Sequence, residues 1–136
     1  MTYLLDTGVL SEMRKRQGDP NVLRWMRGTC PESLFVSTVT IGEIERGIES
    51  QRRRNPIFAD ALGSWLDQMI GIYEDRILPI DVAVARRWGR LTARLGHPGI
   101  DLLIAATALE HGLTAATRNV RHFAPTGVAV ENPFES

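Results

Sequence analysis

The chain has 136 residues, the length of one ordinary domain, and 43% of them are hydrophobic, which is enough for a single core. Charged residues make up 24%, so disorder is not expected, and a formal net charge of zero argues against a strong grip on nucleic acid that ignores sequence. No apolar run approaches the roughly 18 residues of a membrane span. The N-terminus lacks the parts of a signal peptide, and Cys30, the single cysteine, has no internal partner for a disulfide. We therefore expect a cytoplasmic protein.

Short apolar runs alternate along the chain with segments of helical spacing. Asp19-Pro20 is typical of a helix start, Asn55-Pro56 separates two helices, and Gly112 is placed to end another. In chain order, the sequence predicts strand 3–5, helix 7–16, helix 20–27, strand 34–36, helix 38–54, helix 56–72, strand 77–80, helix 81–95, helix 100–111, strand 113–117 and strand 128–130.

This alternation predicts an α/β fold, in which a mainly parallel central sheet of four to five short strands is flanked by helices. No linker or repeat divides the chain, so we expect one domain over residues 1–136. Ligands of such sheets bind beyond the carboxyl ends of the strands. Asp6 directly follows the first strand and Thr117 ends the fourth, while Glu43 and Asp101 lie near the starts of two helices. Four distant pieces of the chain are therefore expected to meet at one sheet edge.

Each of the three acidic residues also has an ordinary structural interpretation. Asp6 and Asp101 are each placed to cap or stabilise a helix N-terminus. Glu43 is placed to form a surface pair with Arg46, one turn later, worth about 0.3 kcal/mol. Taken singly, none of these residues identifies a site.

Taken together, the three carboxylates predict a metal site. Carboxylates about 5 Å apart repel by roughly 3 kcal/mol per pair at an effective dielectric constant of about 20, so gathering them requires compensation. A divalent cation supplies it, and hard oxygen ligands favour Mg²⁺ or Mn²⁺. Zinc is not expected, because the three histidines lack ligand spacing to Cys30 or to one another: His97, His111 and His122.

Four motifs appear in an order and spacing that resemble the PIN-domain proteins, above all the VapC-type toxins of bacterial toxin–antitoxin pairs. They are LLDTGVLSE at residues 4–12, STVTIGE at residues 37–43, IDLLIAA at residues 100–106 and TRNVRHF at residues 117–123. The resemblance covers essentially the whole chain. It implies a Mg²⁺-dependent endoribonuclease that acts on RNA, is inhibited by a small VapB-like antitoxin and forms a homodimer and a toxin–antitoxin hetero-oligomer.

By position, the resemblance assigns the catalytic and metal-binding roles to Asp6, Glu43 and Asp101. Asp6 and Asp101 are the expected principal ligands, and Glu43 completes the site directly or through water. The supporting residues are expected to be Thr7, Thr117, which can hydrogen-bond a metal-binding carboxylate, and Asn119, whose amide can orient a water.

The chain departs from the family pattern at two positions. Gly8 stands where the family often has an Asn that helps hold the active-site loop. The family's fourth acidic position falls near Asn119, a neutral and weaker ligand, so we expect any second metal site to be weaker. Nearby arginines are candidates for holding flanking phosphates: Arg46, Arg118 and Arg121.

Three other functions have some basis in the sequence. Asp6-Thr7-Gly8 matches the signature of aspartic proteases, although those enzymes are almost entirely β. A haloacid-type phosphatase would need a second Asp two residues after the first, where Gly8 stands. The neutral Asn119 also leaves room for a catalytically silent interaction module. Apolar surface for a partner is expected near three tryptophans: Trp25, Trp65 and Trp88.

Overall fold

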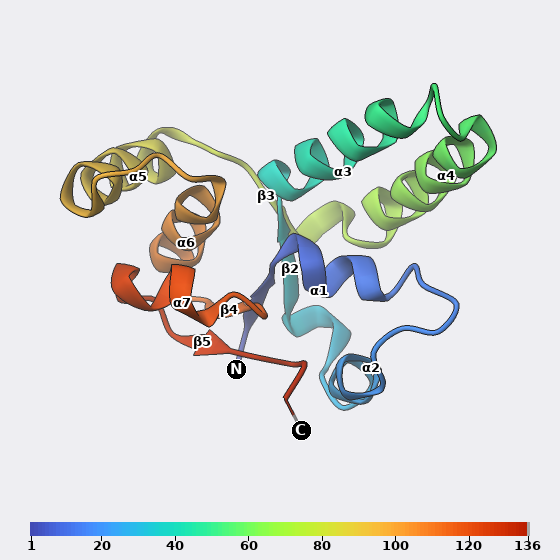
Figure 1. The fold of residues 1–136 in the computed structure, drawn as a ribbon. Coiled ribbons are helices and arrows are strands. Elements are labelled where there is room, and N and C mark those ends of the chain that lie inside the picture. The colour runs from blue at the N-terminus through green and yellow to red at the C-terminus, as the bar shows by residue number, and fades with distance from the viewer. Residues whose placement is uncertain (136) are drawn as a thin grey trace.

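The protein is built around a five-stranded sheet within residues 1–135, the part of the chain that the computed structural model describes. The strand order is β3-β2-β1-β4-β5, and all neighbouring strands are parallel (Figure 1). The first strand of the chain therefore lies in the middle of the sheet, and the predicted parallel α/β fold is confirmed. The strands are β1 (Tyr3–Leu5), β2 (Leu34–Ser37), β3 (Ile77–Leu78), β4 (Thr114–Ala116) and β5 (Val130–Glu131).

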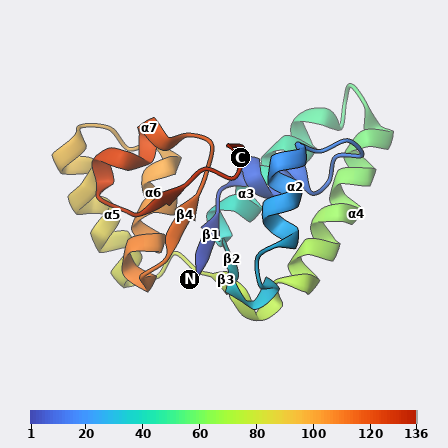
Figure 2. The ribbon, with the colours of Figure 1, turned by 90° about the horizontal axis from the view of Figure 1, so that it is seen from below.

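Helices cover both faces of this sheet. They are α1 (Thr7–Glu12), α2 (Pro20–Arg27), α3 (Thr38–Gln51), α4 (Pro56–Ile72), α5 (Val82–Leu95), α6 (Ile100–His111) and α7 (Val120–Phe123). The first four helices lie on one side of the sheet, and α5, α6 and α7 lie on the other (Figures 1 and 2).

The core is divided by the sheet into two parts, because successive side chains of a strand point to opposite faces. Leu5 and Ala116 belong to the core cluster that α1 to α4 complete. Their neighbours Leu4 and Ala115 belong to the cluster on the α6 and α7 side. The strands are thus buried on both faces, which explains why they read as short, continuous apolar runs.

The helix ends follow the capping residues of the sequence. The side chains of Asp19, Asn55 and Asp81 accept hydrogen bonds from backbone N–H groups in the first turns of α2, α4 and α5. Gly112 ends α6 with a φ of 66°, a left-handed conformation that favours glycine. These predicted boundaries are confirmed.

Three helices differ from the prediction, and α3 does so only by ending at Gln51 rather than at residue 54. α1 ends at Glu12 rather than at residue 16, because the buried Glu12 carboxylate accepts a hydrogen bond from the backbone N–H of Asp19 (2.9 Å) and pairs with Lys15, which turns the chain toward α2. The short helix α7 was not expected at all, since four residues carry no detectable periodicity. Within residues 1–135, no helix combines the length and apolar character needed to cross a membrane.

Candidate active site

The carboxyl edge of the sheet holds a buried carboxylate in its middle. Asp6 follows β1 directly, and its backbone N–H still donates to Ala116 of β4 (2.9 Å), so the residue is fixed between two strands. Only 6% of Asp6 is exposed. The expected helix-capping role is confirmed, because the Asp6 side chain caps α1. The same side chain also faces the edge at which ligands of parallel sheets bind.

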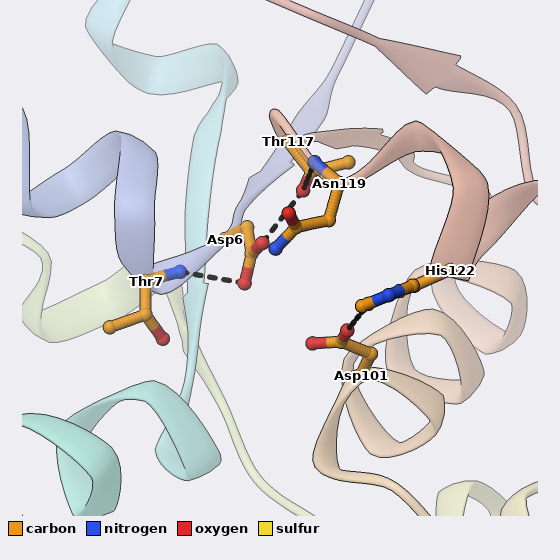
Figure 3. Close-up of polar contacts among 6 residues, drawn as sticks. All are labelled: Asp6, Thr7, Asp101, Thr117, Asn119 and His122. Carbon is orange, nitrogen blue, oxygen red and sulfur yellow. Dashed lines mark hydrogen bonds and ion pairs between the residues drawn. The ribbon is translucent and has the colours of Figure 1, made fainter.

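Both oxygens of the Asp6 carboxylate accept hydrogen bonds. The backbone N–H of Thr7 donates to Oδ1 (2.8 Å), and the Thr117 hydroxyl donates to Oδ2 (2.7 Å), as the sequence predicts for Thr117. The backbone N–H of Asn119 donates to the same Thr117 hydroxyl (3.0 Å) and so fixes its direction. Figure 3 shows the Asn119 side chain reaching toward Asp6. Asn119 thus stands beside the buried carboxylate, although it is not acidic.

The pKa of Asp6 is affected by two carboxylates from distant parts of the chain. Burial is the main reason that the pKa of Asp6 is raised above its usual value of 3.8. The negative charges of Asp101 and Glu43 raise the pKa further, while the hydrogen bonds from Thr117 and Thr7 oppose the rise. Asp6 therefore lies close enough to Asp101 and to Glu43 for the charge of each to raise its pKa.

Glu43 reaches this edge from the second turn of α3. The Thr7 hydroxyl donates to its Oε1 (2.6 Å) and also lies 3.3 Å from the Thr40 hydroxyl. Among the described residues no ion pair joins Glu43 to Arg46, so the interpretation of Glu43 as a surface partner of Arg46 is wrong. Thr7 therefore connects two of the carboxylates, since its N–H binds Asp6 and its hydroxyl binds Glu43.

Asp101 lies in the first turn of α6, on the other side of Asp6. Gly99 is the N-cap residue of this helix, and the Asp101 carboxylate instead forms a 2.8 Å hydrogen bond with Nδ1 of His122 in α7 (Figure 3). An ionised carboxylate only accepts, so the tautomer of His122 that suits this contact is the one with its proton on Nδ1. Sequence reasoning considered His122 only as a zinc ligand and missed this contact. His122 lies in the fourth motif, one turn after Asn119, but no short pattern there indicates Asp101 as its partner.

The donor set suits a hard divalent cation in charge and chemistry. Asp6, Glu43 and Asp101 offer carboxylate oxygens. The pKa of Asp6 is raised first by burial and then by the charges of the other two, a repulsion that a cation would relieve. Within residues 1–135, however, no three Asp, Glu, His or Cys side chains are already drawn together as metal ligands. Metal binding by these three residues therefore stays a prediction.

The three arginines singled out from the sequence surround the site in different ways. Arg46 is exposed on α3 and Arg121 is exposed on α7. The Arg118 guanidinium stacks on the ring of Phe134, 3.9 Å from its centroid. Arg118 and Arg121 line one surface hollow together with Asn119.

Comparison with known proteins agrees with this fold. Residues 3–127 match the PIN domain, and the chain belongs to the PIN-domain family. The chain is 34% identical to the VapC ribonuclease Y4jK of Sinorhizobium fredii, with 97% of each protein covered. It is 32% identical to toxin FitB of Neisseria gonorrhoeae, with 96% of this chain and 97% of FitB covered. The crystal structure of FitAcB from Neisseria gonorrhoeae superposes with a TM-score of 0.87 at 32% identity, over 99% of this chain and all of that chain.

These findings remove two of the rival functions. An aspartic protease is almost entirely β, whereas Asp6-Thr7-Gly8 here joins a central parallel strand to α1 in an α/β fold. The protease interpretation of that tripeptide is therefore wrong. A haloacid-type phosphatase would need a second Asp where this chain has Gly8, and the family match gives that function no support.

Proposed function

We propose that this protein is a metal-dependent endoribonuclease that hydrolyses RNA phosphodiester bonds as the toxin of a toxin–antitoxin pair. The observation that carries the proposal is the buried Asp6 carboxylate, whose pKa is raised by burial and by the facing charges of Asp101 and Glu43 at the carboxyl edge of the sheet. The relatives named VapC ribonuclease and toxin FitB support the same function. We expect the activity in the cytoplasm, where an RNA substrate would be found.

Asp6 and Asp101 would hold a Mg²⁺ or Mn²⁺ ion, and Glu43 would complete the site directly or through a water. When bound, such an ion lowers the pKa of a water and stabilises negative charge on phosphoryl oxygens. Asn119 faces the same space with a neutral amide, so a second ion would be held more weakly than in a site with four carboxylates.

The other residues of the site position the groups that react. Thr117 and Thr7 fix the direction of the Asp6 carboxylate, and Thr7 also fixes Glu43. Glu43 is the residue that orients the attacking water or accepts its proton, because it is only half-buried and its hydrogen bond holds it at the edge of the site. Flanking phosphates of the RNA are held by exposed or partly stacked arginines: Arg46, Arg118 and Arg121.

An antitoxin would bind on the side of α1, α3 and α4. A hollow of about 280 Å³ there is lined in part by Phe58, Leu62 and Trp65, and it extends to Glu43. Structures named FitAB bound to a DNA fragment and FitAcB are among those similar to this chain, which supports an antitoxin partner. All three predicted tryptophans pack against core clusters, and Trp65 also lines this hollow, so it is the one that best fits a partner site. We expect the toxin to be a homodimer within a larger complex with the antitoxin.

The test is cleavage of single-stranded RNA by the purified protein in Mg²⁺ or Mn²⁺ buffer and in EDTA. We expect cleavage by the wild type with the metal and a loss of about 100-fold or more in Asp6→Asn and Asp101→Asn, since each change removes a charged ligand. Asp67→Asn on the exposed surface of α4 is the matched control and should cleave as the wild type does.

Equal cleavage by the wild type and both site variants would contradict the proposal. Absence of cleavage by the wild type under all metal conditions would favour the alternative, a catalytically silent PIN-like interaction module, which the neutral Asn119 at the fourth position keeps in view.

A further inference from the structure

A second hollow opens beside the candidate site, between the loop that joins α5 to α6 and the short helix α7. Its volume is about 560 Å³, within the range of small-molecule sites. Asp101 forms part of its wall, so the hollow is continuous with the carboxylate edge. It lies on the opposite side of the sheet from the proposed antitoxin hollow, which is lined by residues of α1, α3 and α4 (Figures 1 and 2).

The polar side chains of this hollow are suited to RNA. Arg121 is exposed on α7, and among the described residues no carboxylate pairs with it, so its guanidinium is available to a phosphate. His122 is held through Nδ1 by Asp101, and its side chain is 63% exposed. The ring of His122 is therefore fixed in direction while most of it stays accessible.

The rest of the wall consists of apolar side chains and the imidazole ring of His97. Leu95, Ile100 and Pro125 line it together with His97. The His97 ring lies against the backbone of Gly99, where an added Cβ would come within 3.3 Å of Nδ1 of His97. His97 is exposed in this loop, so its ring is accessible to a base that enters the hollow.

We propose that this hollow binds one nucleotide of the RNA next to the bond that is cleaved, with its base stacked on His97 and its phosphate held by Arg121. Single-stranded RNA is recognised by stacking of splayed bases on aromatic side chains and by cationic contacts to the backbone. The shared wall at Asp101 sets this nucleotide immediately beside the carboxylates. The inference rests on the proposed ribonuclease function and adds a site of base selection to it.

The first experiment measures cleavage of a mixed-sequence RNA, with the cut sites read by sequencing of the ends. Because His97 lies outside the carboxylate cluster, His97→Ala is expected to raise KM roughly tenfold, to leave kcat within about twofold and to weaken the base preference beside the cut. His97→Phe keeps a ring for stacking and should retain most of the preference. His111→Ala, an exposed histidine at the other end of α6, is the control and should match the wild type.

The second experiment measures binding without cleavage. In EDTA, single-stranded RNA that carries 2-aminopurine at one position should lose fluorescence on binding to the wild type and to His97→Phe, and much less on binding to His97→Ala. This readout is independent of the metal and of catalysis.

The outcomes separate this inference from the proposed function. Cleavage by the wild type, with KM, base preference and fluorescence all unchanged in His97→Ala, overturns the inference alone. If KM, base preference and fluorescence are unchanged in His97→Ala but this variant binds a partner protein more weakly, the inference is also overturned. The hollow is then a protein-binding surface. Absence of both cleavage and RNA binding in the wild type overturns both proposals. His97-dependent quenching without cleavage overturns the ribonuclease and the placement beside a cleaved bond, and supports only the nucleotide site.

Discussion

The Asp6 carboxylate is held in place by the protein whether or not a cation is near. Thr7 and Thr117 each donate to one of its oxygens, so the side chain cannot turn away from Asp101 and Glu43. In the unfolded chain the same carboxylate is surrounded by water. The negative charge of Asp6 is therefore less stable in the folded protein than in the unfolded chain, and it lowers the free energy of unfolding.

Replacing Asp6 with Asn should make the protein more stable while it removes RNA cleavage. An acid whose pKa is raised in the folded state destabilises that state at pH values above the raised pKa, and the penalty disappears as the pH falls through it. At pH 7 in EDTA, we expect Asp6→Asn to raise the free energy of unfolding by about 1 kcal/mol, a typical gain when a strained functional group is removed. Urea denaturation measures this difference.

The pH dependence is the specific part of this prediction. The advantage of Asp6→Asn should shrink as the pH is lowered toward 3.8, the usual pKa of the group, because the wild-type carboxyl is then protonated and neutral. Asp67→Asn on α4 should show no such trend. An Asp6→Asn protein that is less stable than the wild type at pH 7 would contradict the prediction.

Sequence reasoning reached some of these contacts and not others, for a physical reason. Capping of α1 by Asp6 is a local effect that adjacent residues reveal, and the Asp6–Thr117 contact follows from two strands that end at one edge. The contacts of Thr7 with Glu43 and of Asp101 with His122 depend on how helices are oriented above the sheet. No short sequence pattern encodes that orientation.

The short helix α7 contributes both to the candidate site and to the core. It carries Arg121 and His122, and Phe123 at its end is fully buried in the core cluster on the α6 side. The helix has four residues and no side-chain cap at its N-terminus, so packing of this one ring accounts for its position.

Phe123→Ala should destabilise the protein strongly, by about 3–5 kcal/mol, because it leaves a cavity where the largest fully buried side chain was. Val120→Ala in the same helix removes a side chain that is 39% exposed and should change the free energy of unfolding by less than about 0.5 kcal/mol. Urea denaturation of both variants provides the comparison. Similar losses in the two would show that α7 is not anchored by Phe123.

The predictability of the elements follows from their length and their caps. α4 and α5 were predicted with the correct starts because Asn55, Pro56 and Asp81 mark them and because more than ten residues show helical spacing. The end of α1 was misplaced because a tertiary contact of Glu12 decides it. α7 was missed because its only strong signal is one buried aromatic residue.

At the scale of the whole molecule, the carboxylates come from parts of the chain that the sheet brings together. Asp6 follows β1, Glu43 lies on α3 after β2, and Asp101 lies on α6 before β4. A cation at their meeting point would therefore connect both sides of the sheet, and its binding energy would add to the stability of the complete fold.

Mg²⁺ should raise the melting temperature of the wild type. At a concentration about tenfold above its dissociation constant, an ion that binds only the folded state adds about 1.4 kcal/mol, which corresponds to a few degrees. Asp6→Asn and Asp101→Asn should lose this increase, whereas Asp67→Asn should keep it. A wild-type melting temperature that is the same in EDTA and in Mg²⁺ would count against metal binding, independently of any RNA assay.

The central position of β1 also decides when the site can exist during synthesis. Thr117, the partner of Asp6, lies 111 positions later in the chain, and β1 is flanked on both sides only once β4 has been added. Chains fold from the N-terminus as they emerge, and contacts between distant segments form last. A chain that stops before Asp101 has two of the three carboxylates and no partner strand on one side of β1. A protein that cuts RNA thus has no complete site until its synthesis has passed both Asp101 and β4.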